Sequence, residues 1–149
     1  MEKTRNTFFS FNLAVDAALD PDEILLPPML IQPFIENAIW HGRGANQQPI
    51  DISLVFKQQG SRLLCLIEDN GIGINQSKKD KGSSNGEGPY AHNSVGISNI
   101  QGRVRLLNEK YNLEGSLTIE DKSESQRPLD HGTRVTLFLS LQTNAEWIE

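Results

Sequence analysis

The chain has 149 residues, enough for one domain that buries about 70% of the surface its unfolded chain exposes. Fourteen Lys and Arg against nineteen Asp and Glu give a net charge of −5, which argues against a nucleic-acid-binding protein. The longest apolar stretch, Leu63 to Ile67, is far shorter than the ~20 residues of a membrane span. The lone cysteine, Cys65, excludes a disulfide framework and favours a reducing setting. We therefore expect a cytoplasmic domain that contacts neither nucleic acid nor membrane.

The chain opens with a predicted strand and a predicted helix. Alternating apolar residues predict a strand with one buried face, formed by Phe9, Phe11, Leu13 and Val15. Apolar residues then recur at helical spacing, which predicts an amphipathic helix with the stripe Leu30, Ile31, Phe34, Ile35, Ala38 and Ile39. Pro33 fits the first turn of this helix, where an amide N–H would have no partner, and Gly42 and Gly44 end it.

A β-hairpin and a long polar segment follow. Residues 52–56 alternate, Gly60 turns the chain, and residues 62–69 run to the turn signal Asp69-Asn70-Gly71, so two core strands are expected. Residues 75–94 contain several glycines and a proline but almost no apolar side chain. Loops of this length in a compact domain are uncommon and act as lids or are disordered, so we expect a lid here.

The last third of the chain predicts a helix and two strands. Apolar residues three and four apart predict a second amphipathic helix with the stripe Ile97, Ile100, Val104, Leu107 and Tyr111. Two strands close the chain at 116–121 and 133–141, the second with inward side chains Val135, Leu137, Leu139 and Leu141. Together these elements predict an α+β fold: a two-layer sandwich of about five mostly antiparallel strands with helices covering one face.

Two features at the ends of these elements have the residue types of a binding site. Glu36 and Asn37 stand in the first helix, one turn before His41, and an Asn amide oxygen is a hard ligand suited to Mg²⁺. The alternative is a solvated helix face. Asp69 would place a carboxylate at the end of an apolar face, where it needs donors such as the N6 amino group of adenine. The alternative for Asp69 is an ordinary Asx turn.

Two further features are turns rich in small residues. The segment 94–99 opens the second helix, whose free N–H groups and dipole form an anion site, and Arg103 could add a contact to a phosphate. The alternative is a plain helix start capped by Ser94. His131-Gly132-Thr133 begins the last strand, where the glycine either lets a ligand come close or marks a turn.

The order and spacing of the four features resemble the N, G1, G2 and G3 boxes of the GHKL ATP-binding fold, or Bergerat fold. Sensor histidine kinases, type II topoisomerases, Hsp90 and MutL proteins share this fold. More specifically, LPPMLIQPFIENAIWHG resembles the N box of LytS-like sensor histidine kinases, and FSFNLAVD also fits that group. The resemblance covers residues 7–141 and implies that residues 1–149 form a single catalytic and ATP-binding domain.

The resemblance implies a two-component histidine kinase with ATP and Mg²⁺ as cofactors. Its γ-phosphate would go to a histidine on a dimerisation helix that this chain lacks, and a response regulator would act downstream. Asn37 would hold Mg²⁺, and Glu36 would stand beside it in the metal shell or polarise the phosphoacceptor. His41 would lie where relatives often carry an aromatic ring against the nucleotide. The parent protein would be anchored in the cell membrane.

The remaining implied roles concern the base and the phosphates. Asp69 would accept a hydrogen bond from the adenine N6 amino group, with Thr133 beside it. Gly71 and Gly73 would let the chain pass close to the base. The residues implied at the phosphates are Ser94, Gly96, Ile97, Asn99 and Arg103.

Three positions depart from the family's patterns. Ser94 stands where the G2 box commonly begins with Gly, and Trp40 stands where many relatives have Lys. Pro33 occupies the place of the water-activating Glu of topoisomerases and MutL, which disfavours ATP hydrolysis as the main activity. None of the three histidines lies in a dimerisation motif, so we do not expect the chain to phosphorylate itself. The alternative function is a degenerate nucleotide-binding or partner-interaction module without kinase activity.

Overall fold

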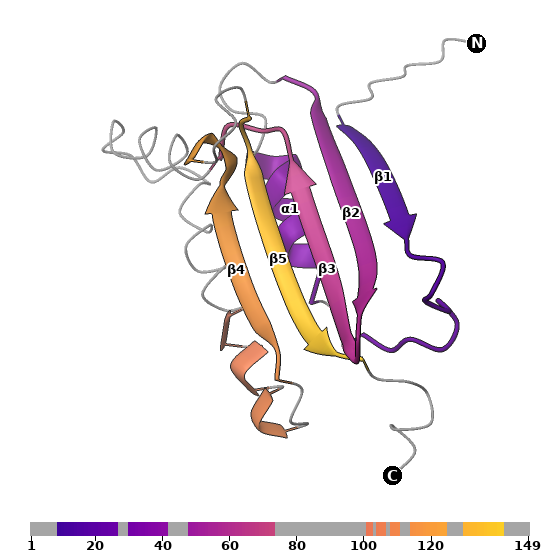
Figure 1. Ribbon diagram of the computed structural model, residues 1–149. Helices are drawn as coiled ribbons and strands as arrows, with labels where there is room; N and C mark the ends of the chain where they lie inside the picture. Colours follow the sequence, from indigo (N-terminus) through magenta and orange to yellow (C-terminus); the bar gives the residue numbers. More distant parts are fainter. Residues whose placement is uncertain are drawn as a thin grey trace, which may run out of the picture.

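A computed structural model of the chain describes residues 9–26, 30–41, 48–73, 101–102, 104–106, 108–110, 114–124 and 130–141. The centre of the structure is a five-stranded open sheet in the order β1-β2-β3-β5-β4 (Figure 1). Strands β1 and β2 run parallel, and the other neighbouring pairs are antiparallel. The strands are β1 Phe9–Val15, β2 Ile50–Gln59, β3 Arg62–Asp69, β4 Ser116–Asp121 and β5 Thr133–Ser140.

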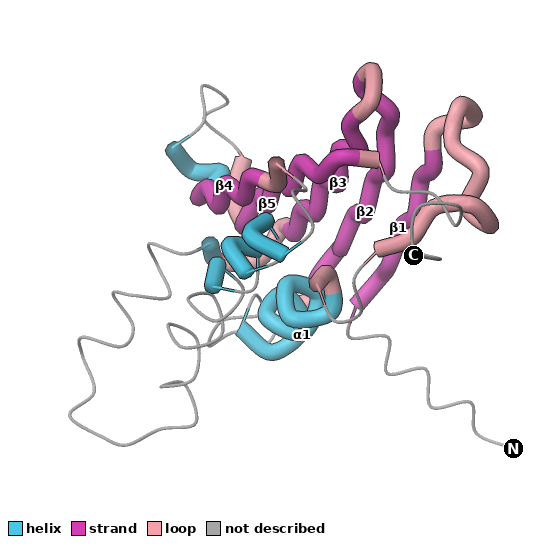
Figure 2. The backbone as a smooth tube through the Cα atoms, turned by 90° about the horizontal axis from the view of Figure 1, so that it is seen from below, coloured by secondary structure: helices cyan, strands magenta, loops and turns pink. Residues whose placement is uncertain are grey.

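The α-helical segments lie on one face of this sheet, as Figure 2 shows, and a short 3-10 helix, η2 (Lys122–Glu124), follows β4. Helix α1 spans Gln32–His41, so Pro33 is in its first turn as expected. Residues 101–102, 104–106 and 108–110 are also helical and belong to the predicted second helix. From the two helical segments, Phe34 and Val104 enter the same apolar core. The predicted two-layer α+β fold, with helices on one face of a mostly antiparallel sheet, is therefore confirmed.

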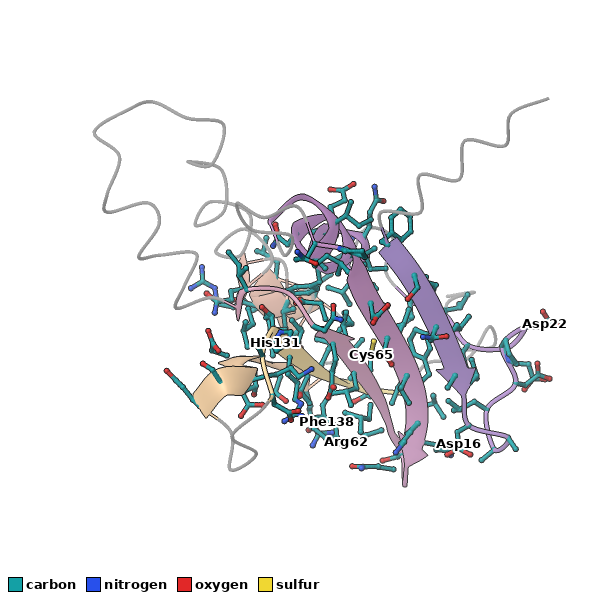
Figure 3. The ribbon with its side chains drawn as sticks, turned by 90° about the horizontal axis from the view of Figure 1, so that it is seen from above. Asp16, Asp22, Arg62, Cys65, His131 and Phe138 are labelled. Atoms are coloured by element: carbon teal, nitrogen blue, oxygen red, sulfur yellow. The ribbon has the colours of Figure 1, made fainter. Side chains whose placement is uncertain are left out.

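The core follows from the alternation in the central strands. In the antiparallel register Cys65 faces Leu137, and Ile67 faces Val135, so these side chains share the helix-covered face. All four are buried in the main core cluster. The opposite face is only partly covered. There the Arg62 guanidinium lies 4.8 Å from the centre of the Phe138 ring (Figure 3).

Strand β1 is present as predicted, but the prediction of a buried face is wrong. Phe11 and Leu13 are 44% and 59% exposed. Their register partners, Ile52 and Leu54, are buried, so the apolar side of β1 does lie on the core face of the sheet. Helix α1 packs against β2 and β3. The alternation therefore identified which side chains share a face, but it could not show that the helical layer leaves the edge strand exposed.

Several predicted segments are not among the described residues. The expected lid at 75–94 lies outside the described ranges, as does the expected start of the second helix. Within the described part of the chain, no helix is long and apolar enough to cross a membrane.

Candidate functional site

The candidate site is centred on Asp69, the last residue of β3. The alternation that buries Cys65 and Ile67 places Asp69 on the same face, where it is 9% exposed. Its Oδ1 accepts hydrogen bonds from the backbone N–H groups of Gly71, at 2.8 Å, and Thr133, at 3.2 Å. The bond from Gly71 is the Asx turn that the sequence left open as an alternative. The bond from Thr133 joins this turn to β5, and among the described residues no donor reaches Oδ2.

The environment of Asp69 disfavours its charge. Burial raises the pKa of this carboxyl above its ordinary value of 3.8. The N–H groups of Gly71 and Thr133 and the positive charge of Lys122 oppose this increase, and the nearby negative charge of Asp121 adds to it. A carboxylate in such a place is stabilised by any further donor, including the amino group of a ligand.

Glycines allow the backbone to pass close to Asp69 and Asp121. Gly73 has φ +79°, and a Cβ there would lie 2.6 Å from Oδ2 of Asp121. Gly132 has φ +107°, and a Cβ there would overlap the backbone carbonyl oxygen of Asp69. Side chains are therefore excluded at both positions by backbone conformation and by space.

The loop after β3 is also fixed to β2. The Asn70 side chain bonds to Asp51 twice, accepting at Oδ1 from the backbone N–H at 2.7 Å and donating from Nδ2 to the carboxylate at 3.0 Å. The backbone N–H of Asn70 also donates to the Asp51 carbonyl oxygen at 3.3 Å. Together with the bond from Thr133, these contacts hold both ends of the turn against neighbouring strands.

Sequence reasoning singled out His131 only as part of the turn before the last strand, and it missed Asp121 and Lys122 at the end of β4. Asp121 is buried at the end of β4, and Lys122 donates from Nζ to the carbonyl oxygen of Asp69 at 3.1 Å. His131, labelled in Figure 3, has its Nδ1 3.0 Å from the carbonyl oxygen of Gly71. The strand order β3-β5-β4 brings these residues beside the end of β3, and local sequence patterns do not reveal that order.

Helix α1 brings Asn37 to the same end of the sheet. The next residue, Ala38, packs in a buried cluster with Ile50 and Ile52. Ile52 is the register partner of Asp69 across the β2–β3 pair. The second half of α1 and the last residue of β3 therefore lie at the same end of the sheet.

The side chains of α1 are suited to an ion that is coordinated only in part by protein. Asn37 is half-buried, and Glu36 is exposed and accepts a hydrogen bond from Gln32 Nε2 at 2.7 Å. Across the described ranges, no three His, Cys, Asp or Glu side chains gather into a metal site. A hard amide oxygen with few other protein ligands fits Mg²⁺, which keeps waters and takes further ligands from phosphates.

The structure does not test the other predicted site residues. His41 is the last residue of α1. The expected phosphate-binding residues lie outside the described residues: Ser94, Gly96, Ile97, Asn99 and Arg103. Their roles remain predictions.

Comparisons with known proteins show the family to which the chain belongs. Residues 23–143 match the family described as histidine kinase-, DNA gyrase B-, and HSP90-like ATPase. The protein YwpD of Bacillus subtilis is 37% identical over 108 residues, which cover 70% of this chain and 36% of YwpD. The sensor histidine kinase/phosphatase LytS of Staphylococcus aureus is 35% identical over 69 residues, which cover 46% of this chain and 12% of LytS. The chain thus corresponds to a minor part of each relative.

Solved structures show the same fold at low sequence identity. The histidine kinase domain of a blue-light-activated kinase from Erythrobacter litoralis matches with a TM-score of 0.57 and 17% identity, over 92% of this chain and 53% of that one. The mycobacterial sensor histidine kinase MprB matches with a TM-score of 0.55 and 12% identity, over 93% of this chain and 86% of that one. With a family match over most of its length, the chain belongs to the histidine kinase-, DNA gyrase B- and HSP90-like ATPase family, as a GHKL domain of the LytS-like kind.

Proposed function

We propose that the chain is the Mg-ATP-binding catalytic domain of a two-component sensor histidine kinase. In this proposal residues 1–149 form one domain with a core at 7–141, and the domain donates the γ-phosphate of ATP to a histidine on a dimerisation helix of the parent protein. The observation that carries the proposal is the Asp69 carboxylate, which is buried at the end of a core strand with Oδ1 held by two backbone N–H groups. Membership of a family of ATPases supports the identity of the ligand.

Asp69 is suited to recognise adenine. Its Oδ1 accepts from Gly71 and Thr133, and no donor within the described ranges bonds to Oδ2, which in this proposal accepts a hydrogen bond from the N6 amino group. Guanine carries a carbonyl oxygen at the corresponding position, and two acceptors would face each other there. A site that is built to bond a donor discriminates strongly against an analogue without one, because its own polar group is then left unpaired.

Asn37 and Glu36 are the proposed catalytic residues. Asn37 would hold Mg²⁺ through its amide oxygen, while Glu36 would complete the metal shell or polarise the acceptor imidazole. When bound, the ion would neutralise part of the negative charge of the phosphates. Phosphoryl transfer depends mainly on positioning and on charge stabilisation, so the task of this chain is to orient the nucleotide toward an acceptor supplied by the parent.

The partners follow from the proposed reaction. The acceptor helix of the parent kinase receives the phosphoryl group, and a response regulator takes it from there. We place the domain in the cytoplasm, attached to a parent protein in the cell membrane. LytS, a relative of the chain, is described as a sensor histidine kinase/phosphatase, which supports a role in signal transduction.

Calorimetric titration with ATP and GTP tests the proposed base site. The chain should bind ATP more tightly than GTP, and Asp69→Ala should weaken ATP binding. Glu120→Ala removes an exposed carboxylate on the opposite face of the sheet and should leave ATP binding unchanged. Equal affinities for the two nucleotides, or normal ATP binding by Asp69→Ala, would contradict the assignment.

The metal site and the transfer step need separate tests. Asn37→Ala should reduce the Mg²⁺ dependence of ATP binding and leave adenosine binding unchanged, since adenosine has no phosphates for the ion to bridge. With γ-labelled ATP, the chain should phosphorylate an added acceptor-helix fragment of its parent but not itself. Binding of ATP without any transfer to that fragment would favour the alternative, a nucleotide-binding module that has lost kinase activity.

A further inference from the structure

Two side chains of the β4–β5 hairpin contact backbone carbonyls at the end of β3 and in the loop that follows it. Lys122, the first residue of the 3-10 helix η2 (Lys122–Glu124), donates from Nζ to the carbonyl oxygen of Asp69 at 3.1 Å. His131, at the other side of the hairpin, has its Nδ1 3.0 Å from the carbonyl oxygen of Gly71. The two contacts therefore flank Asn70 and enclose the turn that carries the Asp69 carboxylate.

The position of Lys122 is fixed on the hairpin side as well. Its backbone N–H donates to the carbonyl oxygen of Gly132 at 2.9 Å, across the base of the hairpin. Its side chain is only 12% exposed, and Nζ lies 3.8 Å from the carboxylate of Glu68. An ammonium group with so little access to water requires protein partners, so the bond to Asp69 is a fixed part of the packing.

The loop is also bounded by Asp121. The Oδ1 atom of Asp121 accepts from the N–H and the hydroxyl of Ser123, at 2.9 and 2.5 Å. Its Oδ2 fills the space where a side chain at Gly73 would begin. The hairpin thus borders the loop at Asp69, Gly71 and Gly73, the three positions that the family resemblance places near the base.

We propose that Lys122 and His131 are positioning residues for recognition of the purine base. They act through the loop: by holding the carbonyls of Asp69 and Gly71, they fix the direction of the Asp69 carboxylate and the path of the backbone beside it. This inference rests on the proposed function, because it names residues that set the base selectivity of the same site. A hydrogen bond is strongly directional, so a small rotation of the carboxylate weakens its bond to an amino group.

Base selectivity separates positioning from a general effect on folding. A loosened Asp69 weakens the bond that only adenine makes, whereas GTP has no such bond to lose. Loss of one hydrogen bond corresponds to about a 3- to 10-fold change in an equilibrium. We therefore expect the ratio of ATP to GTP affinity to fall about 3- to 10-fold in His131→Ala and in Lys122→Met. General destabilisation would lower both affinities together and leave the ratio unchanged.

The chain offers matched variants for this experiment. His131→Asn keeps an N–H donor on the atom bonded to Cγ, where His131 carries Nδ1, and should restore the ratio. Lys122→Met keeps the length of the side chain but removes its charge and its donors. Lys57→Met makes the same replacement at an exposed site in β2 and should leave the ratio unchanged.

Competition titrations on the full chain measure the ratio by displacement of a fluorescent ATP analogue. An unchanged ratio in both His131→Ala and Lys122→Met, or a ratio that His131→Asn fails to restore, would overturn the inference while the proposed function stands. Failure of the unaltered chain to bind ATP would overturn both.

Amide hydrogen exchange without nucleotide provides a second measurement. Exchange at residues 70–73 should be faster in His131→Ala than in the unaltered chain, and equal rates would contradict the positioning role.

Discussion

At the scale of single residues, the candidate site opposes the stability of the domain. Asp69 stands at the end of a strand whose other inward side chains are apolar, and its burial disfavours the charged carboxylate. Two backbone N–H groups and the Lys122 charge offset only part of this effect, since the pKa of Asp69 remains raised. A residue that is selected for stability alone would not be an acid here. A ligand amino group would supply a further donor to this carboxylate.

Replacement of Asp69 by Asn should stabilise the free domain at neutral pH. Because the pKa of Asp69 is raised above 3.8 in the folded state, the folded domain holds this proton to a higher pH than the unfolded chain does. The contribution of Asp69 to the free energy of unfolding therefore falls as the pH rises from about 3.8 through the folded pKa. An Asn keeps the Oδ1 acceptor for Gly71 and Thr133 and carries no charge.

Urea unfolding of Asp69→Asn and the unaltered chain at two pH values checks this prediction. At about pH 7.5 the variant should unfold at a higher urea concentration, and at about pH 3.5 the difference should become small. ATP affinity should fall in the same variant, since the Asn side chain can turn its NH₂ group, a donor, toward the N6 amino group, which is also a donor. A variant that is less stable than the unaltered chain at neutral pH would show that the charge of Asp69 is already well compensated in the free domain.

Two glycines with positive φ should respond very differently to alanine. Gly60, at φ +61° in the β2–β3 turn, has open space around its Cβ position, so Gly60→Ala should cost about 1 kcal/mol from backbone strain alone. Gly132 has φ +107°, and its Cβ would overlap the carbonyl oxygen of Asp69. Gly132→Ala should cost about 3 kcal/mol or more, since strain and overlap add, and it should weaken ATP binding. Equal losses of unfolding free energy in the two variants would contradict this account.

At the scale of elements, local patterns predicted most of the fold because most of its elements are defined locally. Helix α1 has an apolar stripe and a proline that its first turn accepts, and β3 has strict alternation that ends at a turn signal. Asp69 was predicted as a site residue for the same reason, since its place follows from that alternation. The contacts of Lys122 and His131 depend on β5 lying between β3 and β4, and this order is set by packing between segments far apart in the chain.

The burial of β1 was mispredicted because alternation does not report what covers a strand. Leu13 and its register partner Leu54 lie side by side on the same face, but only Leu54 is under the helical layer. Leu54→Ala should therefore cost about 2 to 5 kcal/mol of unfolding free energy, whereas Leu13→Ala should cost about 1 kcal/mol or less. Urea unfolding measures both values. A loss at Leu13 as large as that at Leu54 would mean that the apolar face of β1 is covered in solution.

At the scale of the whole molecule, Cys65 reports on the central layer of the fold. It lies in the middle of β3, between β2 and β5, and is 1% exposed. Burial raises the pKa of its thiol from 9.0 to about 12, so the reactive thiolate is nearly absent at neutral pH. Reaction of Cys65 with a thiol reagent therefore requires an opening of the sheet or of the helical layer above it.

The rate of this reaction should fall in proportion to the fraction of the folded domain that Mg-ATP leaves unbound. If Cys65 is exposed only when the whole domain unfolds, the open population falls by the factor 1 + [ATP]/Kd, which is about 100-fold at 100 times Kd. Labelling by an aromatic disulfide reagent in mild urea should slow by this factor, provided that opening and closing are faster than the chemical step.

The Asp69→Ala variant controls for direct effects of the nucleotide on the reagent. Its labelling rate should hardly change when Mg-ATP is added. If labelling of the unaltered chain is equally fast with and without saturating Mg-ATP, the opening that exposes Cys65 leaves the nucleotide site formed. The central strands and the site would then be separate cooperative units, contrary to the single core in which Cys65 and Val135 pack beside the strand ends that hold Asp69.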